Sequence, residues 1–293
     1  SRCSGLLIQP SPSAKRSPLR RHSGYLGLTS VLRVQIWLDI GSFILNYEYN
    51  LIRGLVMVSS RFGGFSKGLP TFLSELEANN TKAWFDAHRA EYDDLYLQPA
   101  KDFVTAIAAP LAKAVPGAKA EARVNGSIMR INKDVRFSKD KTPYKPHLSL
   151  MFPVGEAFDR KSPALWFRIS PTQLHLGCGM MDFGPTGLKT FRDTIADPKK
   201  AKAFAAIISK AHEAGGWERG TPKYKTVPRG YPAVKEAGGI QADLIRHSGF
   251  HMGTQEPHPN QLFTPDAVDF VCGRLKTLKP VAQWLSETIG SAH

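Results

Sequence analysis

The chain has 293 residues, of which 42% are hydrophobic, and its net charge is +14. It is long enough to bury one substantial core or two small ones, and its charge favours anionic partners. The three cysteines, Cys3, Cys178 and Cys272, are odd in number, scattered and without ligand spacing, so they indicate neither a disulfide framework nor a zinc site. We therefore expect a cytoplasmic protein in a reducing compartment, without a metal, and the residues identify no particular cofactor.

Residues 1–56 differ in composition from the rest of the chain. They contain a Ser/Arg-rich stretch with three prolines, and they hold seven Lys/Arg against two acidic residues. An Arg-rich transit peptide is one interpretation and would give a mitochondrial location, but the prolines disfavour a targeting helix. The apolar stretch 34–58 carries three charges and is a poor membrane span, so we expect no membrane partner. We interpret residues 1–56 as an extraneous or disordered leader and expect a single α+β domain over 57–293.

Apolar residues with a helical period predict helices in both the N-terminal and the C-terminal part of this domain. A first helix is expected over 69–78, and a third begins at Pro99 and ends before Pro116-Gly117. Between them, Asn79-Asn80 is expected to end the first helix and cap a second one, whose stripe is Trp84, His88, Tyr92 and Leu95. Helical patterns return over residues 188–196, 200–214 and 235–246, and from Pro265 to Leu285.

The central part of the chain has a period of 2, which predicts half-buried antiparallel strands. The four predicted strands span residues 129–137, 148–154, 165–170 and 173–180. One parity of these strands is aliphatic and should pack under helices. We therefore predict the α+β class, with an antiparallel sheet of four or more strands and with N-terminal and C-terminal helices packed on one face.

The other parity of the same strands is polar. It collects Arg130, Asp134, Arg136, His147, Trp166, Arg168, Gln173 and His175. If the strands are neighbours, this face is a cationic surface with an aromatic edge, which suits a phosphate or carboxylate group. The alternative is that its charged residues only pair with one another in solvent, an arrangement worth roughly 0–1 kcal/mol per pair.

The densest charge lies in the segment from Arg130 to Lys145, which holds six Lys/Arg and two Asp. Ordering so many long side chains is costly, so a packed cluster of them favours a ligand site or an ion-pair network. The candidate catalytic residues are Asp134, Asp140 and Tyr144, with His175 as a further candidate for proton transfer. The candidate ligand-binding residues are Arg130, Arg136, Lys139, Lys141, Lys145, Trp166, Arg168, His175 and Arg229, of which Arg136, Lys141 and Arg229 are expected to hold the anion.

Three other motifs are weaker. The segment 63–68 has the glycine spacing of a phosphate loop, but Leu69-Pro70 stands where Lys and Ser/Thr are required. The histidines His247, His251 and His258 lack a helical register and a nearby carboxylate, so they are interpreted as surface or core residues rather than metal ligands. Cys178 lies between glycines and is interpreted as a small buried apolar residue.

Three segments of the chain resemble an uncharacterised family, domain of unknown function 2461, known mainly as conserved hypothetical proteins of bacteria and fungi. The resemblance covers about residues 65–285. It rests on Asn79-Asn80-x-x-x-Trp84-Phe85 with Tyr92, on Arg136-Phe-Ser-Lys-Asp-Lys-Thr-Pro-Tyr-Lys145, and on Pro228-Arg-Gly-Tyr231. His88 departs from the asparagine expected at that position. The family has no established activity, so the resemblance implies a domain but not a reaction.

These observations favour one function over two alternatives. We expect the Arg/Lys/Asp cluster to bind a phosphorylated or carboxylated small molecule, and enzymatic processing of that molecule is left open. A nucleic-acid-binding module is permitted by the net charge, although the two interspersed aspartates and the absence of a binding motif argue against it. The third interpretation is a structural ion-pair network without a ligand.

Overall fold

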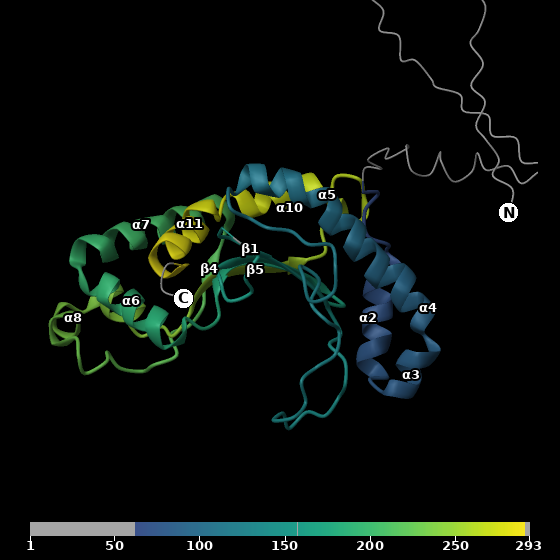
Figure 1. Cartoon of the computed structure of the whole chain (residues 1–293), viewed down its shortest axis with the longest axis horizontal. Coiled ribbons are helices and arrows are strands. Elements are labelled where there is room, and N and C mark those ends of the chain that lie inside the picture. The colour runs from purple at the N-terminus through teal and green to yellow at the C-terminus, as the bar shows by residue number, and fades with distance from the viewer. Residues whose placement is uncertain (1–61, 157, 291–293) are drawn as a thin grey trace, which may run out of the picture. The chain divides into compact units, whose positions relative to one another are not determined.

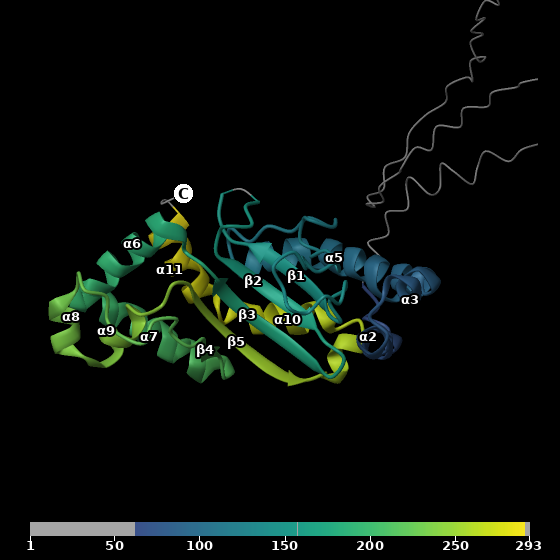
Figure 2. The same ribbon diagram turned by 90° about the horizontal axis from the view of Figure 1, so that it is seen from below.

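The computed structural model describes residues 62–156 and 158–290, so the interpretation of residues 1–56 lies outside the described residues. The sheet that these residues form has five antiparallel strands in the order β1-β2-β3-β5-β4 (Figure 1 and Figure 2). The strands are β1 (Leu148–Pro153), β2 (Ala164–Ile169), β3 (Gln173–Met180), β4 (Glu218–Arg219) and β5 (Phe250–Pro257). With the helices described below, this sheet confirms the predicted α+β class.

One face of the sheet is apolar and lies under helices. The register pairs Leu150 with Phe167 and Phe167 with Leu176, so the buried side chains of three strands share this face. The helices α5 (Gln98–Ala114), α10 (Ala267–Lys276) and α11 (Lys279–Ile289) lie on this side of the sheet (Figure 1). Phe103 of α5 stacks on Phe167, with ring centroids 5.1 Å apart. The predicted packing of N-terminal and C-terminal helices on one face is therefore confirmed.

The N-terminal helices are less regular than the sequence suggests. The first forms as α2 (Gly68–Ala78) and buries the predicted stripe, but the second is divided into α3 (Lys82–Ala87), α4 (Arg89–Glu91) and a π-helical segment, η1 (Tyr92–Leu97). The wider π-helical turn brings Tyr92 and Tyr96 into the core, with centroids 5.0 Å apart. The prediction that Asn80 caps the second helix is wrong, because the Thr81 hydroxyl accepts the hydrogen bond from the Trp84 N–H.

The helices α6 (Gly184–Ala196) and α7 (Pro198–Gly215) correspond to the two predicted between residues 188 and 214. The helix predicted over 235–246 is divided into α8 (Pro232–Ala237) and α9 (Gly239–Leu244). Gly238 lies between them with φ +63° and ψ −149°, a conformation that interrupts a helix and that side-chain-bearing residues rarely adopt. A 3-10 turn, η2 (Asn260–Phe263), precedes α10. None of the described helices combines the length and the apolar character needed to cross a membrane.

The prediction of a strand over residues 129–137 is wrong. Residues 130–145, which we call the basic loop, make only one isolated bridge, between Asn132 and Tyr144, before β1 begins. Phe137, expected on the buried parity, is 96% exposed. Ile131, on the same parity, is buried in the core, so an apolar layer covers only the first part of the segment. Backbone hydrogen bonds within the loop, from Lys133 to Pro143 and from Lys145 to Ile131, replace those of a sheet.

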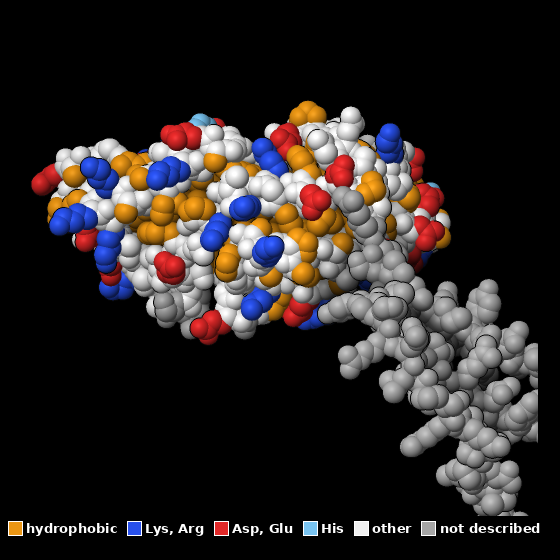
Figure 3. Space-filling model, turned by 90° about the horizontal axis from the view of Figure 1, so that it is seen from above, with side chains coloured by type: hydrophobic (Ala, Val, Ile, Leu, Met, Phe, Trp, Pro, Cys, Tyr) orange, Lys and Arg blue, Asp and Glu red, His pale blue; other side chains and the backbone are white. Residues whose placement is uncertain are grey.

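The helical side of the domain carries charges of both signs. In Figure 3, Lys and Arg side chains are scattered with Asp and Glu side chains among apolar ones, without one continuous basic surface on the visible face. The opposite face of the sheet, which we call the open face, carries the polar parity predicted for β2 and β3.

Candidate functional site

The register of the sheet arranges the open face in rows that run across the strands. Ser149, Arg168, His175 and Gln255 are successive partners in β1, β2, β3 and β5, and we call them the polar row. Two residues further along lie Met151, Trp166, Gly177 and Gly253, which we call the apolar row. The predicted meeting of Trp166, Arg168 and His175 on one face therefore occurs in the structure.

Trp166 lies across the neighbouring strands, over two glycines. A Cβ atom at Gly177 would lie 2.1 Å from Trp166 Cζ2, and one at Gly253 would lie 3.3 Å from the same atom. Only a residue without a side chain fits under the indole at Gly177, because real Cβ atoms do not approach this closely. The two glycines thus let the indole lie close to the backbone of β3 and β5.

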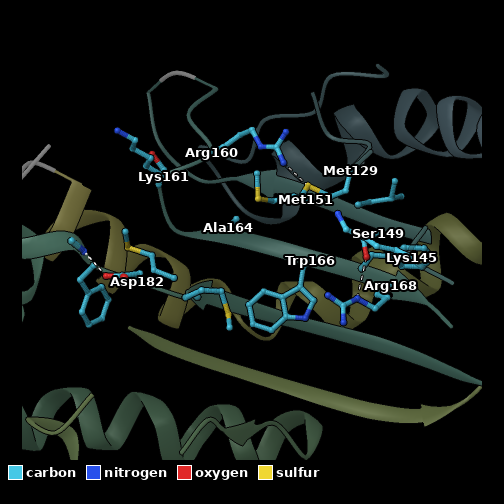
Figure 4. A pocket seen from close by; sticks show the side chains of 18 of the residues that line it. Met129, Lys145, Ser149, Met151, Arg160, Lys161, Ala164, Trp166, Arg168 and Asp182 are labelled. Carbon is cyan, nitrogen blue, oxygen red and sulfur yellow. Dashed lines mark hydrogen bonds between the residues drawn. The ribbon is translucent and has the colours of Figure 1, made fainter. Parts of the chain in front are cut away.

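A cavity of about 980 Å³ opens above β1 and β2. Figure 4 shows that Lys145, Ser149 and Arg168 gather at one end of it, Trp166 lies in the middle and Asp182 lies at the other end. Arg160 and Met129 approach from the segments that flank β1. The pocket therefore combines cationic side chains with apolar walls, which is the usual composition of a small-molecule site.

Three cations of this pocket are held by neutral groups. Arg168 donates from Nε to the Ser149 hydroxyl at 3.0 Å, which leaves its two terminal nitrogens for another acceptor. Lys145 donates from Nζ to the Arg130 carbonyl at 3.2 Å, and Arg160 donates to the Asn125 carbonyl at 3.3 Å. No ion pair between described residues involves Lys145, Arg160 or Arg168.

Burial and neighbouring positive charges determine the electrostatics of the pocket. Burial, and then the positive charges of Arg130, Arg160 and Arg168, lower the pKa of Lys145 below its ordinary value. Partial burial also lowers the pKa of Arg168, although this side chain remains accessible to solvent. Lys145 and Arg168 are therefore partly buried cations that form no ion pair with a carboxylate of the described residues.

Two histidines lie beside these cations and are neutral at physiological pH. Burial, followed by the charges of Arg168 and Lys145, lowers the pKa of His147 to about 4. Burial and Arg168 also lower the pKa of His175. Each ring can then donate one hydrogen bond and accept another without adding charge.

The basic loop places most of the other candidate residues away from this pocket. Asp134 accepts two hydrogen bonds from the guanidinium of Arg136, at 3.0 and 2.7 Å, and both side chains are exposed. Asp140 accepts from Lys133 at 2.8 Å and from the backbone and hydroxyl of Thr142, which lowers its pKa.

Two lysines of the same loop also lie outside the pocket. Lys141 donates to the Val135 carbonyl at 2.9 Å. Lys139 is exposed. Asp134, Asp140 and Lys141 thus bond within the loop, and of the lysines predicted in this segment only Lys145 lines the pocket.

Tyr144 is buried at the base of the basic loop. Its ring stacks on Phe85, with centroids 4.2 Å apart, and its backbone N–H and C=O both bond to the side-chain amide of Asn80, at 3.0 and 2.9 Å. This position suits a structural anchor better than a proton donor to a ligand. Arg130 is exposed next to Lys145, and Arg229 is exposed in the turn before α8 without lining the pocket.

A second hollow of about 680 Å³ lies on the other side of Trp166. Its lining includes His175, Arg219, His251 and Gln255. The His251 ring meets the Trp166 indole edge-on with centroids 6.0 Å apart, and burial lowers its pKa. The other histidines of the sequence motif lie apart: His247 is buried against Phe250, and His258 bonds to the Ser170 carbonyl.

The sequence pattern does not point to several residues of the pocket. Ser149 and Met151 alternate with the aliphatic residues of β1, so this alternation would have predicted their position on the open face. Arg160 and Asp182 lie outside the strands, in segments where alternation gives no signal. Only the folded chain places these two residues beside Trp166.

The comparisons with known proteins concern the family rather than an activity. No curated protein matches the chain. The model of the family described as conserved hypothetical protein (DUF2461) matches residues 69–284, close to the range expected from the sequence. This range includes the whole sheet, the basic loop and the pocket. Because the match extends over most of the chain, the protein belongs to this family.

Proposed function

We propose that the protein binds a phosphorylated or carboxylated small molecule, with its anionic group between Lys145 and Arg168. The observation that carries the proposal is the group of unpaired cations at one end of the pocket. Burial lowers the pKa of both Lys145 and Arg168, and neighbouring positive charges lower that of Lys145 further, so keeping these side chains charged in the fold costs free energy. A bound anion would relieve that cost.

The hydrogen-bonding geometry supports an oxyanion. The Ser149 hydroxyl orients Arg168 through Nε alone, and the terminal nitrogens of a guanidinium can bind two oxygens of one phosphate or carboxylate. The Lys145 ammonium uses one donor on the Arg130 carbonyl and retains two. Neutral His147 adds a donor that does not depend on protonation near pH 7.

Thermal-shift titration tests the proposal. Inorganic phosphate, acetate and a polynucleotide are added at matched ionic strength to the wild type and to Arg168→Gln and Lys145→Gln. Lys139→Gln is the control, since it removes the same charge from the exposed part of the basic loop.

We expect phosphate or acetate to raise the Tm of the wild type and of Lys139→Gln. In the two pocket variants, the same rise in Tm should need at least a tenfold higher anion concentration. An equal loss in all three variants would mean that net charge alone attracts the anion. Stabilisation by the polynucleotide alone, weakening steeply with salt, would support the nucleic-acid alternative instead.

A further inference from the structure

The open face changes polarity along its strands. The polar row begins with Ser149 and Arg168, and the apolar row begins with Met151 and Trp166. Two residues of a strand separate the rows, a distance of roughly 7 Å. An anion at Arg168 would therefore have an aromatic surface directly beside it along β2.

The far end of the pocket is largely apolar and carries two charged residues, Asp182 and Lys161 (Figure 4). Met180, Met181 and Phe183 line this end, and Met181 is 76% exposed. Methionine side chains adapt to the shape of an apolar ligand. Asp182 accepts a hydrogen bond from the Gly184 N–H at 2.8 Å, so its carboxylate is fixed at this end. An anionic group is thus favoured at Arg168 and disfavoured at Asp182.

Trp166 offers a flat surface between the two ends. The glycines under the indole remove the side chains that would otherwise hold it away from the sheet. In the close-up of the pocket the indole lies between Arg168 and the apolar end (Figure 4). Aromatic rings prefer offset-stacked partners, so a planar group fits this surface better than a branched one.

We infer that the ligand is an amphipathic anion, with its charged group at the polar row and a planar apolar body over Trp166 that points toward Met181. This inference rests on the proposed function and adds the class and direction of the ligand. The charged group alone would use Lys145 and Arg168, whereas the body would bury apolar surface on Trp166 and Met151. The two parts of the ligand can therefore be tested separately.

Calorimetric titration compares three probes with the same charged group: inorganic phosphate, 1-naphthyl phosphate and dodecyl phosphate, the last below its micelle concentration. We expect 1-naphthyl phosphate to bind at least tenfold more tightly than phosphate. Trp166→Ala should reduce this difference to about threefold or less, while the affinity for phosphate itself changes little. Trp166→Phe should retain most of the difference.

A variant at the surface avoids any effect on folding. Met181→Asp places a second carboxylate at the apolar end and should weaken 1-naphthyl phosphate several-fold without weakening phosphate. Met181→Leu is the matched control and should bind both probes as the wild type does.

The outcomes separate the inference from the proposed function. If phosphate and 1-naphthyl phosphate bind equally, or if Trp166→Ala leaves their ratio unchanged, the inference is overturned while anion binding stands. Tighter binding of dodecyl phosphate than of 1-naphthyl phosphate would overturn the inference that the apolar part of the ligand is planar. If no probe binds, or if Arg168→Gln binds all of them as the wild type does, the proposed function itself is overturned.

Discussion

Asn80 connects two segments that are far apart in the sequence. Its amide nitrogen donates to the Tyr144 carbonyl at 2.9 Å, and its amide oxygen accepts from the Tyr144 N–H at 3.0 Å. One side chain thus satisfies both backbone groups of a buried residue, as a neighbouring strand would. Asn80→Ala removes both hydrogen bonds and leaves two partly buried backbone groups without a protein partner.

The size of the effect follows from these contacts. A hydrogen bond of this kind contributes about 1 kcal/mol net, and a buried group left unsatisfied costs about 1–3 kcal/mol. We therefore expect Asn80→Ala to lower the free energy of unfolding by about 2–3 kcal/mol. For a domain of this size such a loss lowers the Tm by roughly 5–10 °C.

Urea unfolding and calorimetry of Asn80→Ala and Asn79→Ala provide the measurement. Asn79 is the matched control, because its exposed amide bonds only to the Glu75 carbonyl in the last turn of α2. Its removal should cost less than about 0.5 kcal/mol, as is usual for exposed substitutions. Equal losses in the two variants would refute the role of Asn80 as the anchor of the basic loop.

Three further predictions concern the open face and the loop. The pKa of His147 is lowered to about 4 in the folded chain against an ordinary value of 6.5, so its contribution to stability is present above pH 6.5 and is lost as the pH falls toward 4. His147→Gln should therefore lose less stability than the wild type between pH 7 and pH 4 in urea unfolding, and identical pH profiles would contradict this. Gly177→Ala should destabilise by about 1–3 kcal/mol because the new Cβ meets Trp166, whereas Gly273→Ala, with open space in α10, should stabilise by about 0.5–1 kcal/mol; the same sign for both in chemical denaturation would be inconsistent with the contact. Asp140→Asn should lower the Tm more than Asp134→Asn does, because Asp140 joins Lys133 to Thr142, and phosphate binding should be unchanged in both variants.

The strands of the sheet could be predicted where alternation was supported by burial. Leu165, Phe167 and Ile169 of β2 alternate with Trp166 and Arg168, and both sets lie on the predicted faces. The segment 129–137 has the same alternation, but it forms a loop: Ile131 of its apolar parity is buried in the core, whereas Phe137 of the same parity is 96% exposed. Periodicity describes which side chains could share a face and does not say whether another layer covers that face.

β5, in contrast, is a strand whose sequence lacks a clear strand pattern. Its central residues include Gly253 and polar side chains, which are unusual in a strand, yet it lies between β3 and β4. A Cβ atom at this glycine would lie 3.0 Å from the Leu176 carbonyl oxygen of β3 and 3.3 Å from Trp166 of β2, contacts that the sequence alone does not reveal. The candidate site was therefore predictable as a polar sheet face with Trp166, Arg168 and His175, whereas Arg160, Asp182 and the separation of Asp134 and Asp140 from the pocket depend on the loops.

The place of β5 in the strand order has a consequence for how the chain folds. β3 ends at Met180 and its partner β5 begins at Phe250, so about seventy residues are synthesised before the sheet can be completed. During that interval on the ribosome, β3 presents an unpaired edge, and such edges can recruit other chains. Contacts this distant in sequence also slow folding. We therefore expect chains that end before residue 250 to aggregate through the unpaired edge of β3.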